Sequence, residues 1–172
     1  MKSIPVSVWK YRDQENFKSL SKELGFSTTL PDFINIEKSS TELNIFTKTI
    51  EEYAFKGNLV RKLHVSYNTD ELNRNPDTRF EIILSPDRDD NEFVENSNVL
   101  INKETVNLGL PVQRTREWAM RIHALDGEPE IARVTSWSWS DDSVYYSVSG
   151  DTSDEDLYQD FIRQIIISRQ NL

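Results

Sequence analysis

The chain contains no cysteine, and this absence excludes several kinds of chemistry. Without a thiol there is no disulfide, no thiolate nucleophile and no cysteine-based metal site. The missing disulfides leave the compartment open, because proteins without them occur in reducing and oxidising surroundings alike. Histidine is nearly as scarce: only His64 and His123 are present, and neither belongs to a helical zinc-binding motif.

Glycine is also rare, and its five occurrences stand apart from one another. They form neither a Gly-x-Gly-x-x-Gly loop for a dinucleotide nor a phosphate-binding loop with its lysine and hydroxyl residue. No serine stands in a Gly-x-Ser-x-Gly hydrolase motif. The sequence therefore predicts no cofactor, and every glycine is interpreted as a turn or helix-cap position. These glycines are Gly25, Gly57, Gly109, Gly127 and Gly150.

Long hydrophobic runs are missing as well. No segment approaches the ~18 uninterrupted apolar residues of a membrane span, so no span is predicted in this chain. The opening Met1-Lys2-Ser3-Ile4-Pro5 lacks the apolar stretch of a signal peptide. We expect a cytoplasmic location if Met1 is the native start, and an extracytoplasmic one if the chain is a fragment of an anchored protein.

Acidic residues outnumber basic ones by 29 to 20, which gives a formal charge of -9 at pH 7. Such a charge repels nucleic-acid phosphates, so nucleic-acid binding is not expected. It suits water or a basic protein partner. With 172 residues, including 4 Trp, 6 Tyr and 8 Phe, the chain is long enough to build one core, and residues 1–172 are predicted to form a single domain.

The N-terminal pattern indicates a strand followed by a helix. Ile4, Val6 and Val8 alternate as in a short first strand. Asp13 is a suitable N-cap for a helix over residues 13–24, and Gly25 follows where a helix-ending residue with positive φ belongs.

Residues 41–55 fit two interpretations. A helix would align Leu43, Phe46, Ile50 and Tyr53. A strand would align Leu43, Ile45, Tyr53 and Phe55. We predict a strand, because threonine, isoleucine and aromatic residues favour it and Lys56-Gly57-Asn58 suits a hairpin.

The rest of the chain predicts more strands and a terminal helix. Residues 63–67 and 80–84 alternate and should pair, whereas residues 112–125 fit either a helix or a strand. Asp126-Gly127 is a hairpin signal before residues 131–139, and residues 140–143 turn into residues 144–149, which gives a three-stranded meander. Ser153 and Asp156 resemble a capping box for an amphipathic helix over residues 153–169.

The predicted fold class is therefore α+β. We expect a mostly antiparallel sheet of about five to seven strands, with an N-terminal helix and a C-terminal amphipathic helix packed on the sheet.

Acidic loops provide weak candidates for calcium. Asp87, Asp89 and Asn91 match the opening of a calcium-binding loop, but the required glycine is replaced by Glu92 and the twelfth position is Asn98. Looser sites at Asp87, Asp89 and Asp90, or at Asp151, Asp154 and Glu155, compete with the interpretation of a solvated loop and a charged helix start.

Trp137 and Trp139 lie on the same side of a predicted strand. They form either an aromatic platform for a ligand or part of the core. Carboxylate neighbours such as Glu51 and Glu52 point to opposite faces of a strand, so an acid–base dyad is not supported. We predict no catalytic, cofactor-binding or metal-binding residue. The candidate surface for a ligand or partner comprises Trp137, Trp139, Asp87, Asp89 and Asp90.

One family shares this order of motifs. The relevant segments are Leu24-Gly25-Phe26 before Leu30-Pro31, then residues 63–67, residues 139–151 and the helix over residues 153–168. Residues 13–168 resemble the domain-of-unknown-function family 4367, found in Gram-positive lipoproteins and anti-sigma-like membrane proteins. The resemblance implies an extracytoplasmic, non-enzymatic sensing or binding domain attached to an anchor, and it assigns no functional residue.

The charge and size support a second hypothesis. A compact acidic protein suits a cytosolic immunity protein or antitoxin that blocks a basic toxin. A third, an enzyme that uses scattered carboxylates with His64 or His123, has less support, because the sequence fixes no partner for either histidine. We therefore predict a non-enzymatic domain that recognises or senses a protein or another ligand, in a Gram-positive envelope-associated protein, with the toxin-blocking protein as the alternative.

Overall fold

The computed structural model describes residues 6–55, 57–69, 80–86, 102–122 and 129–171. These residues form two α-helices, α1 (Phe17–Leu24) and α2 (Glu155–Gln170), and nine strands. The strands are β1 (Val8–Tyr11), β2 (Phe33–Ile36), β3 (Thr41–Phe55), β4 (Asn58–Asn68), β5 (Phe80–Pro86), β6 (Asn102–Asn107), β7 (Pro111–Ile122), β8 (Pro129–Asp141) and β9 (Val144–Asp151).

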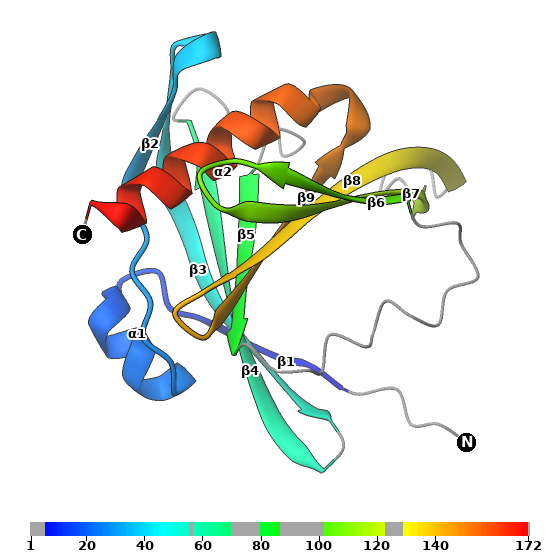
Figure 1. The fold of residues 1–172 in the computed structure, drawn as a ribbon. Helices are drawn as coiled ribbons and strands as arrows, with labels where there is room; N and C mark the ends of the chain where they lie inside the picture. The colour runs from blue at the N-terminus through cyan, green and yellow to red at the C-terminus, as the bar shows by residue number, and fades with distance from the viewer. Residues whose placement is uncertain (1–5, 56, 70–79, 87–101, 123–128, 172) are drawn as a thin grey trace.

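All nine described strands belong to one sheet with the order β1-β3-β4-β5-β9-β8-β7-β6, while β2 pairs with the other end of β3 (Figure 1). The pairings are antiparallel. The predicted class is confirmed, but the prediction of five to seven strands was too low. It missed β2, which has four residues, and β6, whose only apolar residue is Val106.

Residues 41–55 form a strand, as predicted, and Gly57 supplies the positive φ of 81° in the following turn. The register shifts between Ile45 and Thr47, where a β-bulge interrupts the pairing with β4. A bulge reverses the side to which later residues point. Ile50 therefore joins Leu43 in the core, and the predicted common face of Leu43 and Tyr53 was wrong.

The second half of the sheet follows the predicted meander. Residues 111–122 form β7, which settles the choice between helix and strand in favour of a strand. This strand pairs with β8, and β8 pairs with β9. The predicted pairing of residues 63–67 with residues 80–84 is also present, between β4 and β5. The turn residues Asp126 and Gly127 lie outside the described residues.

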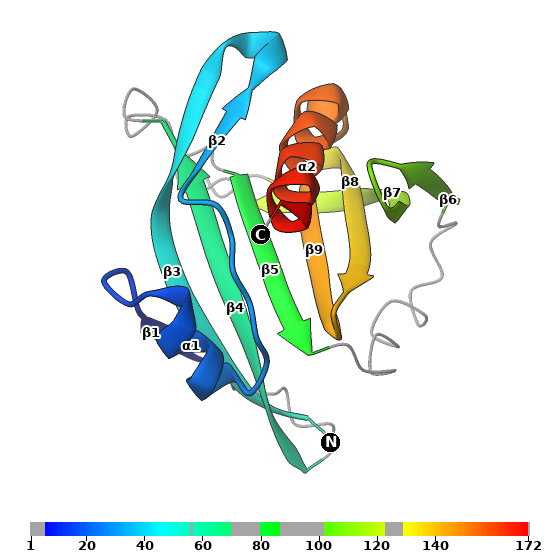
Figure 2. The same ribbon diagram turned by 60° about the vertical axis from the view of Figure 1, so that its left-hand side comes forward.

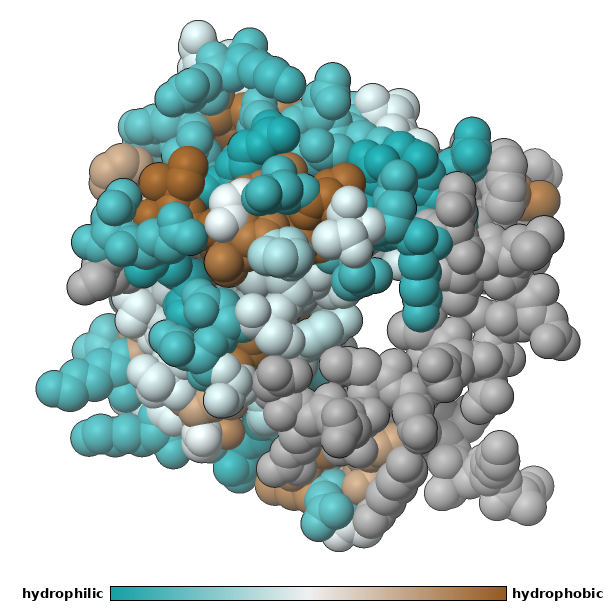
Figure 3. All heavy atoms as spheres, viewed as in Figure 1, coloured by the Kyte–Doolittle hydropathy of each residue, from teal (hydrophilic) through white to brown (hydrophobic). Residues whose placement is uncertain are grey.

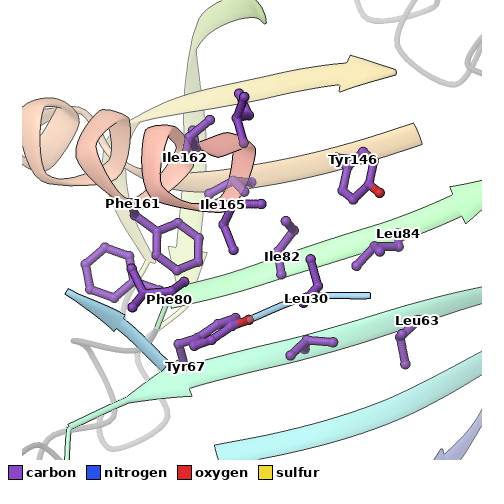
Figure 4. Close-up of a cluster of buried hydrophobic side chains, with 14 of the residues drawn as sticks. Leu30, Leu63, Tyr67, Phe80, Ile82, Leu84, Tyr146, Phe161, Ile162 and Ile165 are labelled. Atoms are coloured by element: carbon purple, nitrogen blue, oxygen red, sulfur yellow. The ribbon is translucent and has the colours of Figure 1, made fainter. Parts of the chain in front are cut away.

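The core lies between α2 and the sheet, which curves around this helix (Figure 2). We call the face of the sheet that packs on α2 the inner face and the opposite side the outer face. Figure 4 shows side chains of α2 pointing at residues of β4 and β5, with Phe161 beside Tyr67 and Phe80. Burying each such side chain contributes about 1.5–3 kcal/mol. The buried residues of α2 are Phe161, Ile162, Ile165 and Ile166.

Both helices begin later than predicted. The side chain of Asn16, not Asp13, caps α1 by accepting a hydrogen bond from Ser19 N, and Asp13 instead accepts one from Lys48 N. A 3-10 turn over Thr152–Asp154 precedes α2, and Asp151 accepts the hydrogen bond from Ser153 N. The predicted capping box starting at Ser153 is thus replaced by an aspartate cap two residues earlier, on the 3-10 turn that leads into α2.

Gly150 departs from the prediction that every glycine serves a turn or a cap. It lies within β9, directly under the ring of Tyr158, and a Cβ at this position would stand 2.1 Å from Tyr158 Cζ. Gly25 and Gly109 have positive φ at a helix cap and a turn, as expected, and Gly127 lies outside the described residues. Gly150 is therefore required for close packing of α2 on β9.

Among the residues coloured in Figure 3, hydrophilic ones predominate on this face, and apolar atoms emerge in limited patches around α2. Ile167, on the solvent side of α2, is one exposed apolar residue of this helix. Neither of the helices in the described part of the chain is long and apolar enough to cross a membrane.

Candidate functional site

The outer face of the sheet carries a cluster of polar and aromatic side chains beside its β1 edge. The register places Trp9 of β1 opposite Glu51 of β3, and Thr49 of β3 opposite His64 of β4. Glu81 of β5 stands opposite Ser66, two residues from His64 on the same face. Four neighbouring strands therefore each contribute one member to the cluster of Trp9, Glu51, His64 and Glu81.

His64 lies between the two carboxylates. Its Nε2 is 2.9 Å from Glu51 Oε2 and its Nδ1 is 3.0 Å from Glu81 Oε1. Ser7 Oγ donates a further hydrogen bond of 2.7 Å to the other oxygen of Glu51. The Trp9 ring stands edge-on to the imidazole with centroids 4.8 Å apart, and the His64 side chain is only 11% exposed.

This geometry fits a charged imidazole. A neutral ring has one N–H and one bare nitrogen, whereas the imidazolium ion donates from both nitrogens. Two carboxylate oxygens at hydrogen-bond distance therefore suit the imidazolium form of His64. In that form the ring links β4 to β3 through Glu51 and to β5 through Glu81. Both ring nitrogens then carry a proton, so neither can accept one from a substrate.

Next to the contacts of His64 with Glu51 and Glu81, three side chains of β1 are exposed to solvent. Val8 is 52% exposed, Trp9 51% and Tyr11 75%. We call these three residues the β1 patch. Trp9 and Tyr11 lie on the outer face, and Val8 points the other way. Val6, just before β1, is also exposed, and β1 begins at Val8, later in the chain than the alternation of Ile4, Val6 and Val8 predicted.

The inner side of β1 is held by ion pairs. Lys10 Nζ lies 2.8 Å from Glu52 Oε1, and Arg61 Nε lies 3.0 Å from the same oxygen. Hydrogen bonds from Lys10 and Arg61 keep the pKa of Glu52 below its usual range. Arg12, just after β1, reaches both Glu15 and Glu23 near α1. These ion pairs fix the strand on the sheet.

A second polar cluster joins α2 to the sheet. Arg116 of β7 holds Glu155 with two hydrogen bonds of 2.7 and 2.8 Å, and the buried Thr135 donates a third of 2.6 Å. Arg116 and Thr135 together lower the pKa of Glu155 to about 2 against the cost of its burial. Protein donors therefore bind Glu155, and this cluster of Arg116, Thr135 and Glu155 fixes the start of α2 on the sheet. We call it the Glu155 cluster.

The Glu155 cluster includes one residue of the weak calcium candidate at the start of this helix, Asp151, Asp154 and Glu155. Asp151 accepts hydrogen bonds from the backbone and the hydroxyl of Ser153, and Glu155 is paired with Arg116. Among the residues that the structure describes, no group of three or more histidine or acidic side chains is arranged to hold a metal ion. Asp87, Asp89 and Asp90, the other candidate, lie outside these residues.

Trp137 and Trp139 are both buried and point into the core. Trp137 stacks on Tyr158 at 5.5 Å and Trp139 stacks on Tyr146 at 5.1 Å between ring centroids. Their placement matches the alternative of core packing. Of the two histidines, His64 has carboxylate partners, and His123 lies outside the described residues.

Sequence analysis missed the β1 patch and the partners of His64. The alternation of Lys62, His64 and Ser66 against apolar residues correctly predicted that His64 faces away from the core. Glu51 could not be assigned to the same face, because the bulge at Ile45 decides its direction. The aromatic residues at every second position, Trp9 and Tyr11, were the available signal for β1.

No family model, no curated protein and no solved structure matches this chain. Its membership of family 4367 therefore stays a prediction.

Proposed function

We propose that this protein is a recognition domain that binds another protein without catalysing a reaction, and that binding takes place at the β1 patch. The observation that carries the proposal is the exposure of Val8, Trp9 and Tyr11 on one short strand. Trp9 and Tyr11 are neighbours on one face of this strand, and exposed aromatic side chains that lie together are typical of interaction sites. Tryptophan and tyrosine are also the residues that most often dominate binding energy.

The fixed position of the His64 ring supports a role of this surface in binding. Its ring is fixed by Glu51 and Glu81 and covered on one side by Trp9. A fixed ring under an exposed tryptophan presents the aromatic surface in one orientation, which reduces the entropy lost on binding. The same contacts occupy both ring nitrogens, so they favour support of a binding surface over proton transfer.

The charge of the chain supports a basic partner. At -9, the protein attracts positively charged proteins at long range and accelerates their association at low salt. This feature favours an immunity protein or antitoxin that blocks a basic toxin. The resemblance to family 4367 favours instead a sensor domain of a Gram-positive envelope protein. Both settings use the same proposed activity, recognition of a protein.

Affinity capture tests the proposal. The wild-type protein and a Trp9→Ala/Tyr11→Ala variant are immobilised and exposed to extract of the source cells at low and high salt. We expect the wild type to retain a basic protein that the variant loses, with weaker retention at high salt. Phe33→Ala is the matched control, because Phe33 is 57% exposed on β2, which pairs with the other end of β3. Equal capture by all three proteins, or by none, would contradict the proposal.

A further inference from the structure

The backbone of β1 offers hydrogen-bonding groups on the side away from the sheet. Arg12 N donates a hydrogen bond of 2.8 Å to Lys48 O, which continues the β1–β3 register. Hydrogen-bonded and non-hydrogen-bonded pairs alternate in an antiparallel ladder. Lys10, like Arg12, therefore directs its N–H and C=O at β3, and the N–H and C=O groups of Trp9 and Tyr11 point outward.

No described strand lies beyond β1, because this strand ends the order of the sheet. In Figure 2, β1 lies at one margin of the sheet and β6 at the other. The exposure of Trp9 and Tyr11 agrees with an open edge. The outward backbone groups of these two residues are therefore in position to pair with another chain.

β1 also lacks the features that usually protect an edge strand. Such edges carry proline, a bulge or an unpaired charge, commonly a lysine, that blocks the addition of a further strand. Val8–Tyr11 contains no proline and its pairing with β3 shows no register shift. Its one charged residue, Lys10, is drawn back to Glu52 of β3 at 2.8 Å. The edge is thus open, apolar and held in an extended conformation.

We propose that an extended segment of a basic partner protein adds to β1 as a further strand of the sheet. The outward N–H and C=O groups of Trp9 and Tyr11 would bond to the backbone of this segment, and alternate side chains of the segment would pack on the two rings. The charge of the chain favours a basic segment over a second copy of the chain as the added strand. A chain of charge -9 attracts a basic segment, whereas two copies of it repel each other. The proposal rests on the proposed function, because it takes the β1 patch as the binding site.

The probe for this proposal is a capped peptide of alternating lysine and valine, which presents a basic and an apolar side when extended. We expect it to bind the full chain at low salt and to slow amide hydrogen exchange at Trp9 and Tyr11. A peptide N-methylated at alternate residues, which cannot donate the strand hydrogen bonds, should bind at least about tenfold more weakly. A peptide with glutamate in place of lysine should be weakened by a similar factor.

Two substitutions at one position separate backbone pairing from ring contacts. Tyr11→Ala removes the ring and keeps the outward N–H, whereas Tyr11→Pro removes both without taking a hydrogen bond from the sheet. We expect the proline variant to bind the peptide at least about tenfold more weakly than the alanine variant. The N-methylated peptide and the amide exchange of the wild type test the same point if the proline variant does not fold.

Several outcomes would overturn strand addition. These are equal binding of the N-methylated and unmethylated peptides, unchanged exchange at Trp9 and Tyr11 in the complex, and absence of peptide binding. If the aromatic substitutions still abolish capture of a cellular partner, the proposed function stands while strand addition fails. Sedimentation that shows a dimer lost in Tyr11→Pro would assign the edge to a second copy and would also overturn the proposal.

Discussion

His64 Nε2 lies 2.9 Å from Glu51 Oε2 across the outer face of the sheet, and this contact links the strand that carries the histidine to the one beside β1. The Glu51 side chain is 17% exposed, whereas Glu81, the other partner of His64, is 46% exposed. Solvent weakens an ion pair by screening it. The bond to Glu51 is therefore the stronger of the two.

We predict that His64→Ala lowers the free energy of unfolding by about 1–2 kcal/mol, because it leaves two carboxylates without their shared donor. Double-mutant cycles in urea should give a coupling of about 1 kcal/mol for His64 with Glu51 and below about 0.5 kcal/mol for His64 with Glu81. Ser66→Ala, on the same face of β4, is the control. The reverse order of the two couplings would contradict the geometry.

Glu155→Gln should lower the free energy of unfolding at pH 7 by about 2 kcal/mol, since the charge-assisted bonds to Arg116 are weakened. The pKa of Glu155 falls from its ordinary 4.5 to about 2 in the fold, so its contribution is complete above pH 4.5. This contribution is lost as the pH falls toward 2. Urea titrations across this range should show a shallower loss of stability with falling pH in the variant than in the wild type. An equal pH dependence of stability in the two proteins would contradict the stabilising role of Glu155.

We predict that the raised pKa of Tyr146 makes the protein lose stability at alkaline pH. Burial is the main cause that raises the pKa of Tyr146 from 10 to about 12. The native state therefore keeps a proton that the unfolded chain releases, and stability falls as the pH rises from 10 to 12. Tyr146→Phe should make this fall shallower. Tyr145→Phe, which alters the neighbouring side chain on the outer face, should not, and equal slopes for both variants would refute the prediction.

Gly150→Ala should destabilise the protein by about 1–3 kcal/mol, because the new Cβ collides with the Tyr158 ring. Combining it with Tyr158→Leu should cost less than the sum of the two single changes, since the smaller side chain leaves room. Thermal or urea unfolding of the three variants measures this. Ser149→Ala, at the neighbouring position on the outer face, is the control, and simple additivity would argue against the close contact.

Local patterns predicted the strands of the sheet well where apolar and polar residues alternate. The strand at residues 63–67 is one case, because Leu63, Val65 and Tyr67 alone supply its buried side. The terminal helix was also predicted, since its apolar residues recur at helical spacing and bury against the sheet. Its first turn was not, because Asp151 accepts the hydrogen bonds of Ser153 and caps a 3-10 turn that precedes the helix.

By itself, the sequence determined the α+β class, the hairpin at Gly57, the outward direction of His64 and the acidic charge, because each depends on composition or on residues close in the chain. Tertiary structure decided the rest. One bulge in β3 turned Glu51 toward His64, and the pairing of β1 with β3 left Trp9 and Tyr11 at an open edge. The β1–β3 pairing joins residues about forty positions apart, and the bulge breaks the regular alternation of β3, so neither relationship has a signal in the local pattern.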